Sequence, residues 1–136
     1  MGMLDLKQGH DADAVEEFRH AVQLDPNDFQ LLASVAHVLA ADQDPRGRDG
    51  NAAVALSLKA NALTGGSQPF VLDVVGMACA EVGRFPEAQQ AAQQALDLAR
   101  NAKMTKIGPI EERLKLYQQH QPWRESFLAT NRPAGR

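Results

Sequence analysis

The chain has 136 residues, of which 44% are hydrophobic and 23% charged, proportions that are typical of one soluble globular domain. Its 14 lysines and arginines against 17 aspartates and glutamates give a net charge of −3, so no positive field exists to attract nucleic acid or an anionic membrane. The single cysteine, Cys79, cannot form an intramolecular disulfide or a thiolate zinc site. Only 5% of the residues are aromatic and alanine recurs throughout, so we expect helices packed on helices.

The first third of the chain predicts two amphipathic helices and a loop. Residues 11 to 24 place apolar side chains on one face at helical spacing, and Pro26 ends that helix. Asp28 is suited to cap a second helix over residues 29 to 41. Residues 42 to 50 contain one proline, two glycines and alternating charges, so we expect an exposed loop that is too polar to pack.

Helices and short turns continue to alternate along the rest of the chain. Helices are predicted over residues 51 to 63, 69 to 82 and 86 to 100, and Thr64-Gly65-Gly66 is suited to end the first of them. A last amphipathic helix is predicted from about residue 107 to about residue 118, with Gly108-Pro109 leaving its start open.

One pattern of small and apolar residues recurs in three of these helices, with its units 39 and 35 residues apart: Ala14, Phe18, Ala21; Ala53, Ser57, Ala60; and Ala88, Ala92, Ala95. The second interval is close to the 34-residue period of helical-hairpin repeats, and the first exceeds it by about the size of the loop insertion. The spacing therefore predicts a repeat array.

The third unit carries a more specific pattern, formed by Leu72, Val75, Gly76, Cys79, Gly83, Phe85, Ala88, Ala92 and Ala95. On these residues the chain resembles the tetratricopeptide repeat (TPR) family. Gly2, Gly9, Ala14, Phe18, Ala21 and Pro26 match in the first unit, whereas Ala36 replaces the first glycine of the second unit. The resemblance implies an all-α, right-handed array of antiparallel helical hairpins, an α-solenoid.

This resemblance divides the chain into repeats and a cap. We expect a truncated first repeat over residues 1 to 27, a second over 28 to 67 with a loop insertion at 42 to 50, and a third over 68 to 102. A capping helix and anchor would follow over 103 to 123, and a flexible tail over 124 to 136. Because the first repeat looks truncated, we expect the chain to be part of a longer protein.

A second resemblance is to the TPR segment at the C-terminal end of larger bacterial multi-repeat proteins. It is carried by Asp44, Pro45, Arg48, Asp49, Gly50, Leu63, Thr64, Gly65, Pro69, Leu116, Tyr117, Pro122, Trp123 and Arg124. It implies that the last helix closes an array, with Tyr117 and Trp123 as anchors. The solvent-exposed outer face of that helix would be formed by Glu111, Glu112, Arg113, Lys115 and Gln118.

No residue cluster indicates catalysis, a metal or a cofactor. The densest group of possible metal ligands is His10, Asp11, Asp13, Glu16 and His20, which we interpret as a solvated helix face. Cys79 occupies a position that TPR hairpins bury, so we expect an unreactive core thiol. We therefore assign no catalytic residue, no metal site and no cofactor, and we do not expect an enzyme within these residues.

The candidate site is the concave groove that the first helix of each hairpin lines in TPR proteins. The residues it would contain are Gln30, Ala33, Ser34, His37, Phe70, Asp73, Val74, Met77 and Glu81. They lack the basic residues of a clamp for C-terminal carboxylates and suit an apolar or basic segment. On this hypothesis Met77 is accessible to a partner; the alternative is that Phe70, Val74 and Met77 pack against a neighbouring repeat.

The preferred function is a non-catalytic scaffold that binds a protein or peptide through this groove. The alternatives are a self-assembly module, a homodimer joined through the truncated N-terminal repeat edge, and a non-catalytic C-terminal region of a larger bacterial protein, which itself could be an enzyme. Nucleic acid is not expected as a partner, because the net charge is −3. Membrane insertion is not expected, because no apolar run reaches the roughly 18 residues of a membrane span. Residues 1 to 9 show no secretory signal. The cytoplasm is slightly favoured for this chain, and the compartment of the full-length protein is left open.

Overall fold

The computed structural model describes residues 11–126, and the side chains of all of these except residues 11–15 and 18. Within that range the protein is all-α, with no strand. Its six α-helices are α2 (Asp11–Leu24), α3 (Phe29–Ala41), α4 (Gly50–Leu63), α5 (Pro69–Glu81), α6 (Phe85–Asn101) and α7 (Gly108–Gln118), with a short 3₁₀ helix, η1 (Pro45–Gly47), between α3 and α4. All six were predicted from the sequence, with ends that agree to within one residue wherever the sequence defines them.

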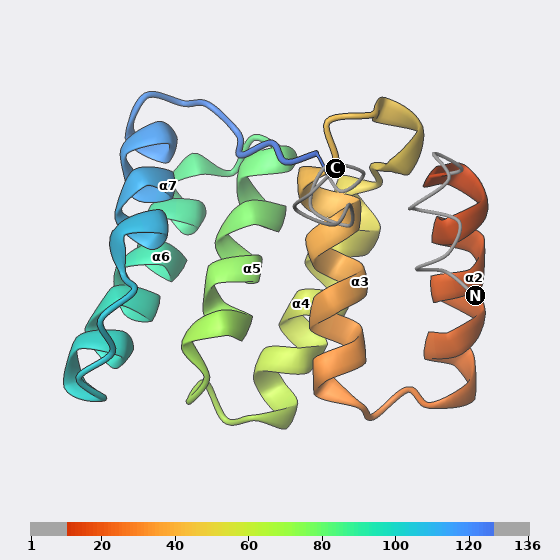
Figure 1. Cartoon of the computed structure of the whole chain (residues 1–136), viewed down its shortest axis with the longest axis horizontal. Coiled ribbons are helices and arrows are strands. Elements are labelled where there is room, and N and C mark those ends of the chain that lie inside the picture. Colours follow the sequence, from red (N-terminus) through yellow and green to blue (C-terminus); the bar gives the residue numbers. More distant parts are fainter. Residues whose placement is uncertain (1–10, 127–136) are drawn as a thin grey trace, which may run out of the picture.

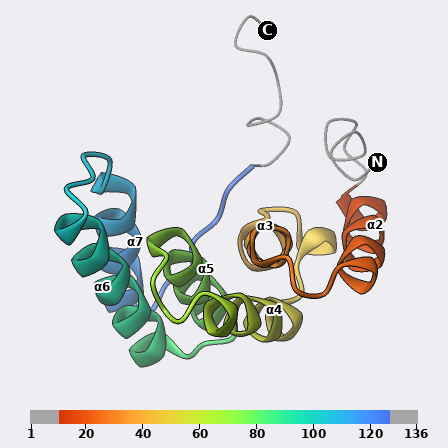
Figure 2. The ribbon, with the colours of Figure 1, turned by 90° about the horizontal axis from the view of Figure 1, so that it is seen from below.

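The helices stand side by side in a curved row, in which most contacts join neighbours in sequence (Figures 1 and 2). Helices α3 and α5 lie on the inner side of the curve, and α4 and α6 lie on its outer side. Helix α7 packs on α6 at one end of the row, and α2 packs on α3 at the other. None of the described helices is both long enough and apolar enough to span a bilayer.

Local signals in the sequence explain where the helices start and stop. The carboxylate of Asp28 accepts a hydrogen bond from the backbone N–H of Leu31, which confirms the predicted cap of α3. Asp49 caps α4 in the same way, through the N–H of Ala52. The predicted end of α4 is confirmed as well, because Gly65 and its successor take positive φ angles that a residue with a side chain rarely adopts.

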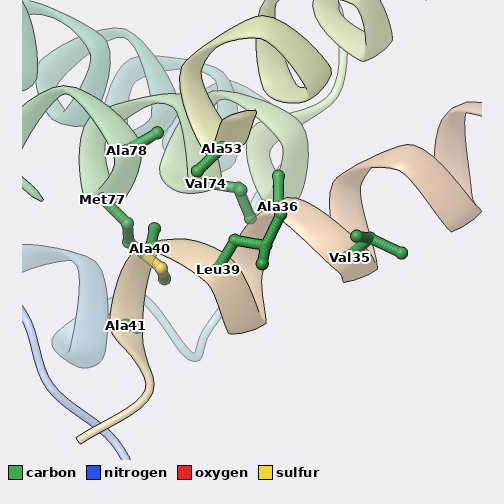
Figure 3. Close-up of a cluster of buried hydrophobic side chains, with 9 residues drawn as sticks. All are labelled: Val35, Ala36, Leu39, Ala40, Ala41, Ala53, Val74, Met77 and Ala78. Carbon is green, nitrogen blue, oxygen red and sulfur yellow. The ribbon is translucent and has the colours of Figure 1, made fainter. Parts of the chain in front are cut away.

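Small side chains bring the helices close together. The cluster in Figure 3 joins α3, α4 and α5 through nine buried residues, five of which are alanines. At Gly76 on α5, an added Cβ would lie 3.3 Å from the backbone oxygen of Ala88 on α6 and 3.3 Å from the ring of Tyr117 on α7. The absence of a side chain at Gly76 thus lets three helices meet.

The position of Cys79 follows the prediction. Its side chain is 6% exposed and lies in a cluster of buried apolar residues from α5, α6 and α7. Burial raises the pKa of the thiol above its usual value, since an ionised sulfur would lose its hydration there. Cys79 is therefore a core residue with low thiolate reactivity.

The loop between α3 and α4 differs from the prediction that it would be too polar to pack. Asp42 is 1% exposed and Gly47 is buried. Arg48 donates a hydrogen bond to the backbone oxygen of Asp42, and the backbone N–H of Asp49 donates to Leu39. The loop packs because its charged side chains and backbone groups satisfy one another.

The outer face predicted for α7 is also wrong at one residue. Glu112, Lys115 and Gln118 are exposed as expected, but Arg113 is only 8% exposed. Its guanidinium faces Asp73 of α5, so the charge is paired inside the protein instead of being hydrated. Tyr117, one of the two predicted anchors, is fully buried against α5 and α6.

The predicted flexible tail begins at Arg124, yet Arg124 and Glu125 are held against α3 and α5 by hydrogen bonds and ion pairs. Residues 127–136 lie outside the described range. So do residues 1–10, which include Gly2, Gly9 and His10 from the sequence patterns.

We predict that Gly76→Val lowers the free energy of unfolding by about 2 kcal/mol, because the new side chain must push the α6 backbone and the Tyr117 ring away from α5. Ala62→Val, at an exposed position of α4, is the matched control and should cost less than about 1 kcal/mol. Urea unfolding of both variants measures this, and equal losses would show that close approach at Gly76 is unimportant.

Candidate functional site

The candidate site is the inner face of the curve at the C-terminal ends of α3 and α5. An extended segment of the same chain packs against this face. This segment, residues 121–126, is called the strap here. It leaves α7 and crosses to the end of α3 (Figures 1 and 2). The backbone N–H of Glu125 donates to Ala41 at 2.7 Å, and the N–H of Gln43 donates to the Glu125 oxygen at 2.9 Å, so the strap is paired with the chain that follows α3.

The strap completes the end of helix α3. The last four carbonyls of any α-helix have no partner within that helix. In α3 the carbonyls of residues 38 and 39 accept from the N–H groups of Asp42 and Asp49. Those of Ala40 and Ala41 accept from the Arg124 side chain, at 3.4 Å, and from the Glu125 backbone. Half of this helix terminus is therefore satisfied by the loop and half by the strap.

Trp123 is the apolar anchor of the strap. Its half-buried ring packs against the apolar clusters on both sides of α5. The guanidinium carbon of Arg113 lies 5.0 Å from the ring centre, within range of a cation–π interaction. The indole N–H donates to the carboxylate of Glu125 at 2.7 Å, so the ring and the carboxylate are held together.

The Glu125 carboxylate also meets His37 of α3, whose Nε2 lies 2.6 Å from Glu125 Oε1. Burial raises the pKa of Glu125, but the hydrogen bond and charge of His37, with contributions from Trp123 and Arg113, outweigh burial and hold this pKa below its usual value of 4.5. The folded protein therefore favours the ionised carboxylate at this point.

A buried ion pair lies beneath Trp123 and joins α5 to α7. Arg113 meets the Asp73 carboxylate with two nitrogens, and its Nε lies 2.8 Å from Asp73 Oδ1. Burial raises the pKa of Asp73, and the Arg113 guanidinium opposes that rise. Each charge stabilises the other, because burial removes most of the solvation of both groups.

Arg124 is bound by a carboxylate of α5. Its terminal nitrogen lies 2.7 Å from Glu81 Oε1, as an ion pair and not as a directed hydrogen bond. Arg48, from the loop after α3, approaches the other Glu81 oxygen to 3.4 Å. Glu81 thus lies between two guanidinium groups, one from the strap and one from the body of the protein.

The structure separates the predicted groove residues into three groups. Ala33, Asp73, Val74 and Met77 are buried; His37 and Glu81 are partly buried and bound to the strap; and Gln30, Ser34 and Phe70 are exposed. The expectation that Met77 is accessible is wrong, since it is 2% exposed between α3 and α5 (Figure 3). The alternative that such residues serve packing fits Val74 and Met77.

Several residues of this site were missed from the sequence. Arg113 was placed on a wet face, and Arg124 and Glu125 were placed in the tail. The available signal was the succession of an aromatic, a basic and an acidic residue, Trp123-Arg124-Glu125, after the last helix. That signal does not name the partners of these residues, which stand on α3, α5 and α7.

Part of the inner face is open. Gln30 and Ser34 on α3 and Phe70 on α5 lie one to three helical turns N-terminal to the residues of their helices that bind the strap. Phe70 is 46% exposed. The rings of Phe70 and His37 make a T-shaped contact, with the two ring centres 6.4 Å apart. His37 therefore joins the open part of the face to the part that the strap covers.

Two other places on the molecule have single features of a site. A depression of about 290 Å³ lies on the outer side between α4 and α6, with Leu58, Cys79 and Ala91 among its lining residues. Of the predicted ligand cluster, Glu16 and His20 are exposed, and within residues 11–126 no group of three or more acidic, histidine or cysteine residues could hold a metal ion. Neither place combines charge, burial and directed bonds as the strap site does.

Comparison of the chain with protein-family models, curated proteins and solved structures gives no match.

We predict that Arg113→Met lowers the free energy of unfolding by about 3 kcal/mol, because it leaves Asp73 as a buried carboxylate without its cation. The double variant Asp73→Leu/Arg113→Met should regain much of that loss, since no charge is then buried. Arg100→Met is the matched control: in its ion pair with Glu111 the two side chains are 50% and 44% exposed, so its cost should stay below about 1 kcal/mol. Denaturant unfolding gives all three values, and a double variant as unstable as the single one would contradict the prediction.

We predict that the effect of Glu125→Gln depends on pH. Because the folded-state pKa of Glu125 lies below 4.5, its stabilising effect is present above about pH 4.5 and is lost as the pH falls through that lower pKa. The variant should be about 1 kcal/mol less stable than the wild type at about pH 6, and this difference should be smaller at about pH 3. Urea unfolding at both pH values tests this, and a constant difference would mean that the charge of Glu125 is not involved.

Proposed function

We propose that this chain is a non-catalytic interaction module of the TPR type, and that its inner face binds an extended segment of another protein. The observation that carries the proposal is the strap, because the same face already holds an extended segment by backbone hydrogen bonds, ion pairs and an aromatic anchor. Extended segments are commonly recognised by this combination of backbone pairing and side-chain subsites.

The repeat character of the proposal rests on spacing and packing together. Helices α3 and α4 form one packed pair, α5 and α6 form the next, and α4 and α5 join the two pairs. Gly76 stands at the close contact between α5 and α6, the position where the TPR pattern has a glycine. These features support a solenoid of hairpins with α7 as its cap.

The chemistry of the face favours holding over catalysis. Around the strap, the side-chain carboxyl groups of Asp73, Glu81 and Glu125 each lie beside a cationic or hydrogen-bonding partner. Such groups position a ligand well, but they have no free proton acceptor aimed at an open cavity. We therefore propose protein binding and not an enzymatic activity.

A second candidate role is that of the terminal segment of a larger, repeat-containing protein. The observation that favours it is α7, which buries Tyr117 against α5 and α6. On its other side this helix exposes Glu112, Lys115 and Gln118. A helix that is apolar inward and polar outward is what the end of a solenoid requires. This role is compatible with binding at the inner face.

We predict that a library of extended peptides contains members that bind the full chain through its open face. Ser34→Trp should weaken their binding at least tenfold, because Ser34 is exposed on the same side of α3 as Gln30 and His37. Lys59→Trp, at an exposed position of α4, should leave binding unchanged. Fluorescence polarisation of the captured peptides measures both effects.

Two outcomes would contradict the proposal. One is that no peptide binds the folded chain above background. The other is that Ser34→Trp and Lys59→Trp affect the captured peptides equally, which would place their binding elsewhere.

A further inference from the structure

Three successive strap residues each meet a different chemical environment. Trp123 lies on an apolar surface with the Arg113 cation beside its ring. Arg124 meets the Glu81 carboxylate, and Glu125 meets His37. The backbone at Glu125 is paired on both its N–H and its C=O. The inner face thus has three side-chain subsites of distinct chemistry, in register with one extended segment.

We propose that the strap is an internal ligand: this face recognises an extended segment in which an aromatic residue, an arginine and a carboxylate follow one another, and the chain fills it with its own copy. A protein partner that carries this order binds by displacing residues 121–126. The inference rests on the proposed function and specifies both the partner's chemistry and the regulation of the site.

The order of residues matters because of the charges that surround each subsite. A carboxylate in the place of Arg124 would face Glu81, and an arginine in the place of Glu125 would approach Arg113 and His37. Like charges at such distances are destabilising, so a segment with the two residues exchanged should bind more weakly than one with the order of the strap.

The strap is bound firmly enough to compete with a partner segment and weakly enough to be displaced by it. Trp123, Arg124 and Glu125 are only partly buried, and the backbone hydrogen bonds of Glu125 join it to Ala41 and Gln43 at the end of α3. Its connection to α7 runs through the exposed residues Gln119 and His120, where His120 takes a positive φ of 58° and stacks on Phe85. A tethered ligand acts at an effective concentration of the order of millimolar, which an incoming segment must exceed in affinity.

The test uses Trp123, which is the only tryptophan of the chain and reports directly on the strap. The probe is a synthetic peptide with the sequence of residues 119–126, in which the tryptophan is replaced by a non-fluorescent analogue that keeps the indole N–H. Added to the wild-type chain, it should shift the emission of Trp123 to the red and increase its quenching by acrylamide. Two control peptides carry Gln in the place of Glu, or exchange Arg and Glu, and each should need at least tenfold higher concentration.

Variants of the chain test the receptor side. Glu125→Gln weakens the internal copy, so the probe peptide should displace it at about tenfold lower concentration than in the wild type. In His37→Ala, the preference for the Glu peptide over the Gln peptide should fall from tenfold to less than about threefold. Circular dichroism checks that both variants keep their helices, and the wild-type titration stands on its own if either variant does not.

The inference is overturned if Trp123 emission stays unchanged at millimolar probe in both the wild type and Glu125→Gln. It is also overturned if the Gln or exchanged peptide displaces the strap as well as the probe does. If library peptides bind at Ser34 while Trp123 stays in place, the proposed function holds and the internal ligand is rejected. If neither the library nor the probe binds, both are rejected.

Discussion

The ion pair between Asp73 and Arg113 is the interaction on which the arrangement of the inner face depends. It joins α5 to α7 in a setting where neither charge is hydrated, so each fixes the position of the other. The guanidinium held in this way lies beside Trp123, and Trp123 in turn donates to Glu125. The position of the strap therefore depends on an ion pair in the interior. A substitution at Asp73 would alter the surroundings of Glu125 through Arg113 and Trp123, without a direct contact between the two carboxylates.

A second constraint comes from the end of helix α3. Its last carbonyls need donors, and the loop after the helix supplies only part of them. Alanine at positions 40 and 41 leaves the remaining carbonyls accessible, so a neighbouring segment can reach them. The helix terminus thus gives the inner face a place for backbone pairing, which an all-helical protein otherwise lacks because its amides are used within the helices.

The sequence predicts those parts of this structure that local rules decide. Helix positions follow from the spacing of apolar residues and from Asp28, Gly65 and Pro26, each of which acts on residues within one or two turns. The burial of Cys79 followed from its place in the repeat pattern. The grouping of His37, Asp73 and Glu81 on one face was a prediction from the TPR resemblance, which implies that all three line one groove.

What could not be predicted is which distant residue satisfies each charge. Arg113 resembles a solvated residue until its contact with Asp73, 40 positions earlier, is known. Glu125 resembles part of a tail for the same reason, since its partner His37 is 88 positions away.

These long-range contacts also divide the inner face into an open part and a part that the strap covers. A segment that binds only beside Phe70 and Ser34 can leave the strap in place. One that extends further must replace the donors to Ala40 and Ala41 and the charges at Glu81 and His37, so selectivity is greatest at the end that the strap covers.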